Sequence, residues 1–266
     1  MVRCPKCSYS RAWKLSDGRL RCRRCRHRYT DQTVWRSSRL SERTKHKLVE
    51  LFSLGVPVYR MRFRDIASAP AIERFFRHIR ACCALEEHCR EPFQGAVECD
   101  ESTFGGARHG KRGWGAAGKI IVFGLLQRNG TIRAVPLKGR RGAEIMRLVQ
   151  EHTRPGSLYY TDDWQAYASL AVRGGHIVVR KERGKPKGRD HINGIEGFWS
   201  YAKHWLYPYR GVPQKYFNFY LGEICFRFNH RNEDLYPLTI KMLKNSKYSQ
   251  IKPLLVRFDT NLTSNI

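Results

Sequence analysis

The fold is decided by two neighbouring segments, Gly95-Ala-Val-Glu-Cys-Asp100 and Lys119-Ile-Ile-Val-Phe-Gly-Leu-Leu126. Both are short apolar runs, and the second is rich in β-branched residues, which is typical of buried strands. The pair Asn129-Gly130 favours a tight hairpin turn, and Thr131–Leu137 has the composition of a third strand. The sequence therefore predicts an antiparallel meander of three strands.

Helices and strands alternate after this meander. Their predicted ranges are helix Ala143–His152, strand Ser157–Thr161, helix Trp164–Leu170, strand His176–Arg180, a helix from about Ile192 to Leu206 and a helix over roughly Gln214–His230. The order is that of the α/β ribonuclease-H-like fold, in which helices cover both faces of a mixed sheet.

Three carboxylates lie near the ends of these predicted strands and helices. Asp100 ends the first strand, Asp162 ends the fourth, and Glu196 lies in the first turns of the helix after the fifth. Strand ends of an α/β sheet converge on one rim, where ligands bind. Clustered carboxylates repel one another unless cations neutralise them, and oxygen ligands favour Mg²⁺ or Mn²⁺. Two ions about 4 Å apart would suit phosphoryl transfer.

Two of these assignments have rivals close by in the sequence. Glu98 and Glu101 compete with Asp100, and Asp163 competes with Asp162. Because side chains alternate along a strand, Glu98 shares a face with Asp100, and we expect it to be a secondary or packing residue.

The predicted helix that carries Glu196 has a polar stripe beside its core stripe. Glu196 and Lys203 share the polar stripe, which would let Lys203 reach a phosphate. The alternative is that both residues are solvated surface charges. The core stripe consists of Ile192, Ile195, Trp199, Ala202 and Leu206.

A metal site is predicted near the N-terminus. Cys4-Pro-Lys-Cys7 and Cys22-Arg-Arg-Cys25 are two C-x2-C knuckles, which can deliver four thiolates to one structural Zn²⁺ in a zinc ribbon. Unconnected buried thiols or a redox CxxC are the alternatives. The other five cysteines lack paired spacing and are expected to pack as small hydrophobic residues.

The charge of the chain points to nucleic acid. The 266 residues include 50 Lys+Arg against 23 Asp+Glu, a net charge of +27, and such self-repulsion is usually offset by a polyanion. The predicted phosphate-contacting residues lie in the ribbon, in a Gly-rich loop over 105–119, in the basic segment 180–189 and on the late helix: Arg23, Arg24, Lys111, Arg112, Arg183, Lys185, Lys187, Arg189 and Lys203.

Association with a membrane is the alternative explanation for this positive charge. The sequence contains neither an apolar run of about 18 residues nor an apolar segment within the first 30 residues. It therefore predicts no transmembrane span and no signal peptide. We expect a cytoplasmic protein, associated with the nucleoid when bound to DNA.

Four segments follow from these patterns: a zinc ribbon over 1–35, a helical DNA-binding segment over 36–91, the ribonuclease-H-like catalytic domain over 92–240 and a C-terminal tail over 241–266. Within the second segment, Ser41-Glu-Arg-Thr44 can cap a helix, and a basic helix follows Pro70. This arrangement suggests a helix-turn-helix, with a plain helical linker as the alternative.

Several spaced motifs occur in a characteristic order along nearly the whole chain. They are Val97-Glu-Cys-Asp-Glu-Ser-Thr-Phe-Gly-Gly106, Gly115-Ala-Ala-Gly-Lys119, Tyr160-Thr-Asp-Asp-Trp-Gln-Ala-Tyr167, His191-Ile-Asn-Gly-Ile-Glu-Gly-Phe-Trp-Ser200 and Phe226-Arg-Phe-Asn-His-Arg231. With the cysteine knuckles, they make the sequence resemble the DDE transposases of bacterial insertion sequences that carry an N-terminal zinc ribbon.

The resemblance implies a catalytic triad of Asp100, Asp162 and Glu196, with Asp100 bridging two Mg²⁺ and the other two carboxylates holding one ion each. Such enzymes cleave the transposon 3′ ends and join them to target DNA, and Lys203 would contact the terminal DNA. The implied partners are double-stranded DNA and further copies of the chain. A structure-selective nuclease or resolvase of the same fold, and a non-catalytic zinc-ribbon regulator, are the alternative functions.

Overall fold

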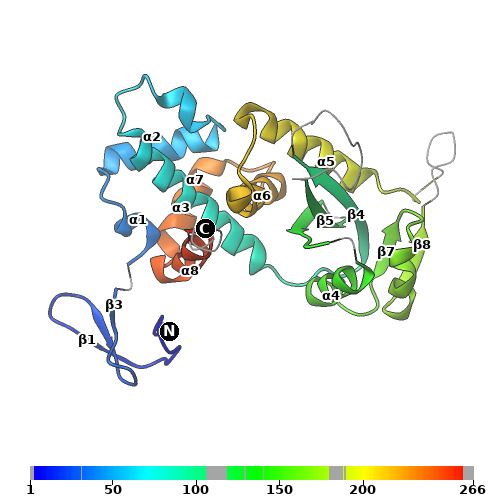
Figure 1. The fold of residues 1–266 in the computed structure, drawn as a ribbon, viewed down its shortest axis with the longest axis horizontal. Coiled ribbons are helices and arrows are strands. Elements are labelled where there is room, and N and C mark those ends of the chain that lie inside the picture. Colours follow the sequence, from blue (N-terminus) through cyan, green and yellow to red (C-terminus); the bar gives the residue numbers. More distant parts are fainter. Residues whose placement is uncertain are drawn as a thin grey trace, which may run out of the picture. The chain divides into compact units, whose positions relative to one another are not determined.

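The computed structural model describes residues 3–30, 32–105, 119–128, 130–139, 141–179, 188 and 190–259. The chain forms two compact units, one made of Met1–Leu85 with Asp234–Ile266 and the other of Glu86–Glu233. The second unit is therefore an insertion in the first (Figure 1). Among the described residues, none of the helices combines the length and the apolar composition needed to cross a bilayer.

The first unit begins with a small antiparallel sheet. Its strands are β1 (Ala12–Lys14), β2 (Leu20–Cys22) and β3 (Arg28–Tyr29), paired in that order. Tyr29 is buried against Cys4 and Cys22, so the aromatic ring braces the sheet from inside. Such a small core agrees with a fold that depends on a bound metal.

Helices make up the rest of the first unit. Ser41 caps α2, since its Oγ accepts a hydrogen bond of 3.1 Å from the backbone N–H of Thr44. Helix α7 packs on α1 and α2, and Tyr236 Oη lies 2.8 Å from His46 Nδ1. The helical elements are α1 (Val34–Ser37), α2 (Glu42–Ser53), the 3-10 helix η1 (Val58–Met61), α3 (Ala69–His88), α7 (Leu235–Asn245) and α8 (Tyr248–Asp259).

The second unit contains a five-stranded mixed sheet in the order β6-β5-β4-β7-β8. Strand β4 pairs antiparallel with β5 and parallel with β7, which also pairs parallel with β8. The elements are β4 (Ala96–Phe104), β5 (Ile120–Gln127), β6 (Thr131–Pro136), α4 (Gly142–His152), β7 (Leu158–Thr161), η2 (Gln165–Val172), β8 (Gly175–Val178), α5 (Asn193–Leu206), η3 (Tyr207–Tyr209) and α6 (Gln214–Asn229).

These elements agree with the predicted ranges to within a few residues, except at β4. The strand continues to Phe104, so Asp100 lies inside it and does not end it. The reason is that β4 pairs with β5 up to Phe104, whereas its pairing with β7 covers only Ala96–Glu98. On the β7 side, Asp100 therefore still lies beyond the paired region.

Two hydrophobic cores lie on opposite faces of this sheet. One is built with α5 and α6 and contains Ile195, Phe198 and Ile224. The other is built with α4 and η2 and contains Leu148 and Tyr167. The unit is therefore the predicted α/β arrangement, a mixed sheet with helices on both faces.

Candidate functional site

The four cysteines of the two knuckles form one cluster. Their sulfur atoms all lie within 4.8 Å of one another, and Sγ of Cys4 is 3.5 Å from Sγ of Cys25. Burial alone would raise the pKa of the Cys22 thiol. Hydrogen bonds from the backbone N–H groups of Cys25 and Arg24 outweigh it, and the pKa is lowered to about 6. Four thiols that converge in this way, one of them readily ionised, fit the tetrahedral coordination of Zn²⁺.

The other cysteines follow the sequence expectation with one exception. All nine cysteines of the chain are thiols. Cys82, Cys83, Cys99 and Cys225 are buried, as expected for small hydrophobic residues, but Cys89 is exposed near the end of α3. The expectation for Cys89 was therefore wrong.

Basic side chains surround an aromatic ring on the ribbon. Arg23 and Arg24 are exposed, and Trp13 keeps 37% of its surface accessible. The guanidinium carbons of Arg23 and Arg26 lie 5.5 Å and 4.8 Å from the centre of the Trp13 ring. Sequence reasoning did not single out Arg26, whose left-handed backbone (φ 60°) turns the chain at the second knuckle.

Asp100 and Asp162 lie on neighbouring parallel strands. The last paired positions of β4 and β7 are Glu98 and Tyr160, so Asp100 and Asp162 each follow the paired region by two residues. Both aspartates are half-buried. Oδ1 of Asp162 accepts a hydrogen bond of 3.1 Å from the backbone N–H of Trp164, which begins the turn into η2.

Helix α5 brings Glu196 to the same region. One turn after Glu196, the indole Nε1 of Trp199 donates a hydrogen bond of 3.0 Å to Oδ2 of Asp100. On the other flank of the helix, Phe198 packs against Phe228 of α6, and α6 lies on β6. Residues 196 and 198 point about 160° apart around a helix axis, so Glu196 lies on the flank of α5 opposite to the one that packs on α6.

The carboxylates of Asp100, Asp162 and Glu196 are spread more widely than the sulfur atoms of the cysteine cluster. Among the described residues, the four cysteines are the only group of three or more potential ligands whose donor atoms all lie within 4.8 Å of one another. Asp100 comes from β4, Asp162 from the turn after β7 and Glu196 from α5, and the three do not form a tight cage for a single ion. Their donor atoms are all carboxylate oxygens, which suit Mg²⁺ or Mn²⁺.

The three alternative carboxylates named from the sequence, Asp163, Glu101 and Glu98, lie in different environments. Asp163 is exposed beside Asp162. Glu101 is buried on the opposite face of β4. Burial of the Tyr167 phenol is the main cause that raises its pKa, and the charge of Glu101 is the second. Glu98 shares the face of Asp100, is 1% exposed and accepts a hydrogen bond from the start of α5.

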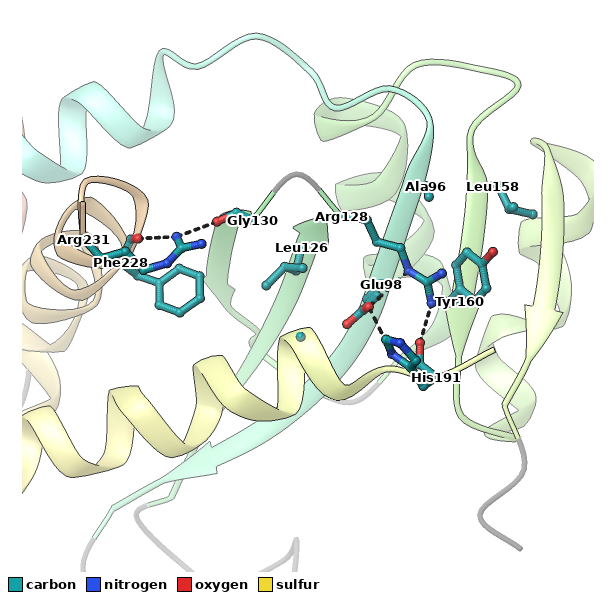
Figure 2. Close-up of a pocket in the computed structure, with 11 residues that line it drawn as sticks. Ala96, Glu98, Leu126, Arg128, Gly130, Leu158, Tyr160, His191, Phe228 and Arg231 are labelled. Carbon is teal, nitrogen blue, oxygen red and sulfur yellow. Dashed lines mark hydrogen bonds and ion pairs between the residues drawn. The ribbon is translucent and has the colours of Figure 1, made fainter. Parts of the chain in front are cut away.

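Glu98 belongs to a polar cluster at one wall of a cavity of about 680 Å³ (Figure 2). Nε of Arg128 lies 3.2 Å from Oε1 of Glu98, and the same guanidinium donates to the carbonyl oxygen of His191 over 2.6 Å. The guanidinium also stacks on Tyr160, 3.5 Å from the ring centre. No sequence pattern pointed to this cluster, because its members come from four separate segments.

The predicted phosphate contacts are only partly placed. Lys203 is exposed on α5, two turns after Glu196. The remaining basic positions lie outside the described residues, namely Lys111, Arg112, Arg183, Lys185, Lys187 and Arg189.

Comparison with known proteins adds evidence of a different kind. A family model described as the ISXO2-like transposase domain matches residues 92–229. A transposase-like protein of Haemophilus influenzae is 32% identical over 91 residues, which are 34% of this chain and 74% of the relative. A protein in the transposable element ISH50 of Halobacterium salinarum is 26% identical over 240 residues, which are 80% of each chain.

Solved structures give a weaker likeness. A chain in the cryo-EM structure of a simian T-cell lymphotropic virus intasome in complex with PP2A regulatory subunit B56 gamma aligns with 75% of this chain and 72% of its own length. The TM-score is 0.34 and the sequence identity is 12%.

Proposed function

The chain belongs to the ISXO2-like family of insertion-sequence DDE transposases, and we propose that it binds the terminal inverted repeats of its element, cleaves their 3′ ends and joins them to target DNA. The second unit would be a ribonuclease-H-like catalytic domain. The mixed sheet, its strand order and the helices on both faces support this assignment.

In this proposal, Asp100, Asp162 and Glu196 hold two divalent cations. The observation that supports it most is the parallel pairing of β4 and β7, which ends two residues before Asp100 and Asp162, together with the packing of α5, which bears Glu196, on β4. Two Mg²⁺ or Mn²⁺ ions would activate the attacking water or 3′-hydroxyl and stabilise the leaving 3′-oxygen. The protein's own contribution is to hold its carboxylates at this rim before DNA arrives.

The DNA would be held by the basic surface of both units. Arg23 and Arg24 on the ribbon would contact phosphates of the transposon end, with Trp13 beside them. Lys203, two helical turns after Glu196, would contact the terminal phosphates near the cleaved bond. Because transposition joins two ends, we expect the chain to act as a homo-oligomer on DNA.

The test uses the full-length protein, Mg²⁺ and labelled duplexes that carry the inverted repeats flanking its own coding region. Asp100→Asn should abolish 3′-end cleavage while the footprint on the repeats persists. Glu151→Gln changes an exposed carboxylate of α4 in the same way and should cleave normally. Nicking by Asp100→Asn at the rate of the unaltered protein would contradict the assignment.

The same assay separates the rivals and the alternative functions. Asp162→Asn should abolish cleavage and Asp163→Asn should not. A supercoiled target plasmid should become joined to the cleaved 3′ ends, as a transposase requires. Hydrolysis without joining would indicate a nuclease or resolvase, and end binding without any Mg²⁺-dependent nicking would indicate a regulator.

A further inference from the structure

Helix α5 is attached to strand β4 by two polar contacts. Oε2 of Glu98 accepts a hydrogen bond of 2.9 Å from the backbone N–H of Ile195, and Nε1 of Trp199 donates one of 3.0 Å to Oδ2 of Asp100. Two residues along a strand advance about 6.6 Å, and four residues along a helix advance about 6.0 Å. The two spacings match, so the helix follows the strand in the same direction with both contacts made.

The contact at Glu98 caps the first turn of α5, beside a longer contact of 3.4 Å from the backbone N–H of Asn193 to Nδ1 of His191. Ile192, at the N-cap position, has no side chain that could accept a hydrogen bond from the first turn. A buried carboxylate fills this role and also interacts favourably with the positive end of the helix dipole. Gly194 makes the approach possible, because a Cβ there would lie 2.9 Å from Oε2 of Glu98.

Glu98 is itself held from the other side. Arg128 bonds Oε1 of this carboxylate, and its guanidinium is fixed in turn by the carbonyl oxygen of His191 and the ring of Tyr160 (Figure 2). Both oxygens of Glu98 are thus engaged, one by the helix and one by Arg128. The side chain is a rigid anchor between the strand and the helix.

We propose that Glu98 and Trp199 are positioning residues of the active centre. Together they fix the position of α5 along β4 and its rotation about its own axis, and so set the position of Glu196 relative to Asp100. The Trp199 indole also orients the Asp100 carboxylate. The proposal rests on the proposed function, because it takes Asp100 and Glu196 as metal ligands. A helix held at one point can slide or turn, whereas two contacts a helical turn apart prevent both motions.

The first test replaces the indole donor and measures metal binding without any reaction. Trp199→Phe keeps an aromatic ring but removes the N–H that Asp100 accepts. Loss of a partner that orients a metal ligand typically costs 10-fold to 100-fold in metal affinity, so Mg²⁺ should bind the full-length variant at least about 10-fold more weakly in calorimetry without DNA. Unchanged Mg²⁺ affinity would overturn the proposal.

Trp205→Phe is the matched control. Trp205 lies on the same helix, and its buried Nε1 has no acceptor among the residues that the structure describes. Its substitution should leave Mg²⁺ affinity unchanged. In NMR spectra of the unaltered protein, the indole N–H signal that Trp199→Phe removes should shift as Mg²⁺ is added, whereas the signal that Trp205→Phe removes should stay in place.

A second pair of variants tests Glu98 independently of Trp199. Glu98→Gln keeps an oxygen that can accept the hydrogen bond from Ile195, and Glu98→Met has a similar length with no such acceptor. Glu98→Met should weaken Mg²⁺ binding about 10-fold, and Glu98→Gln should restore most of the affinity. Equal losses in the two variants would show that Glu98 acts as a ligand and not as a cap.

Failure of the proposal and failure of the proposed function give different results. If Asp100→Asn retains both Mg²⁺ binding and cleavage, the assignment of the active centre itself is wrong. If Asp100→Asn loses both but Trp199→Phe and Glu98→Met bind Mg²⁺ normally, only the positioning role is wrong. Should Trp199→Phe fail to fold, the Glu98 pair decides the question alone.

Discussion

Gly124 and Trp199 approach so closely that a Cβ on residue 124 would lie 2.7 Å from Cζ2 of the indole. Gly124 is the position on β5 that pairs with Asp100 on β4. The missing side chain leaves room for the indole against β5, where its N–H reaches the Asp100 carboxylate. The glycine is therefore required by this contact and not by its own backbone conformation.

Gly124→Ala should accordingly destabilise the second unit. The added methyl group cannot fit without moving the Trp199 ring, and such overpacking typically costs about 1–3 kcal/mol. Urea unfolding followed by tryptophan fluorescence measures the loss. Gly124→Ala should also weaken Mg²⁺ binding, because displacement of the indole removes its hydrogen bond to Asp100.

The double variant Gly124→Ala/Trp199→Phe separates these two effects. Phe lacks the outer ring atoms that the new Cβ would meet, so the double variant should recover stability relative to Gly124→Ala. It should not recover Mg²⁺ affinity, since the indole donor is gone. Additive losses of stability in the two single variants would show that the contact between residues 124 and 199 is not the cause.

Zinc removal provides a prediction for the ribbon. Cys22→Ser should lower the bound zinc from one equivalent per chain to almost none, because Cys22 is the thiol whose ionisation its backbone N–H partners favour. Since the small sheet has little core of its own, binding to transposon ends should be lost with the metal. Elemental analysis and a gel-shift assay measure the two effects.

Cys89→Ser is the control for this experiment. Cys89 is exposed just after the end of α3 and lies outside the cysteine cluster, so its substitution should leave both zinc content and end binding unchanged. Full zinc occupancy in Cys22→Ser would contradict the ribbon.

Local sequence patterns predicted most of the elements and few of their contacts. The short apolar runs around Val97 and Val122 and the helical stripe of Ile195 and Trp199 are set by residues close in the sequence, so local patterns sufficed. The length of β4 was missed because its last residues are held by β5 and not by β7.

The contacts that define the candidate site join residues nearly 100 positions apart. Glu98 bonds Ile195 and Asp100 bonds Trp199, and nothing in either local pattern indicates the partner. The segment after residue 241 had no motif, yet it forms the end of α7 and all of α8, and Lys247 pairs with Thr33. Such pairing depends on the tertiary structure of the whole unit.

Asn229 at the end of α6 offers a further test, since its amide acts as an extra partner for the edge strand β6. Oδ1 accepts from the backbone N–H of Ile132 over 2.7 Å, and Nδ2 donates to the carbonyl oxygen of Ile132 over 2.9 Å and to Glu87 over 2.6 Å. Asn229→Leu leaves these groups unpaired, which should cost about 1–3 kcal/mol of unfolding free energy in urea. Asn193→Leu, at an exposed position of α5, should cost less than half as much.

Acid should destabilise the second unit through His152. Its Nδ1 lies 2.7 Å from the guanidinium of Arg133, and burial, followed by the charge of Arg133, lowers the pKa of His152 to about 4. The unfolded chain has a histidine pKa of about 6.5, so between pH 6.5 and pH 4 it binds more protons than the folded chain. The stability that the neutral imidazole contributes is therefore complete above pH 6.5 and falls as the pH drops toward 4, by about 2 kcal/mol at pH 5.

His152→Asn tests this origin of the acid sensitivity. Its amide oxygen can take the place of Nδ1 as the acceptor for Arg133 but does not titrate. Urea unfolding at about pH 7.5 and pH 5 should therefore show a smaller loss in the variant than in the unaltered protein. His78 of the first unit, whose pKa is also lowered to about 4 by burial, leaves part of the sensitivity in place. An equal loss in both proteins would assign the acid sensitivity to groups other than His152.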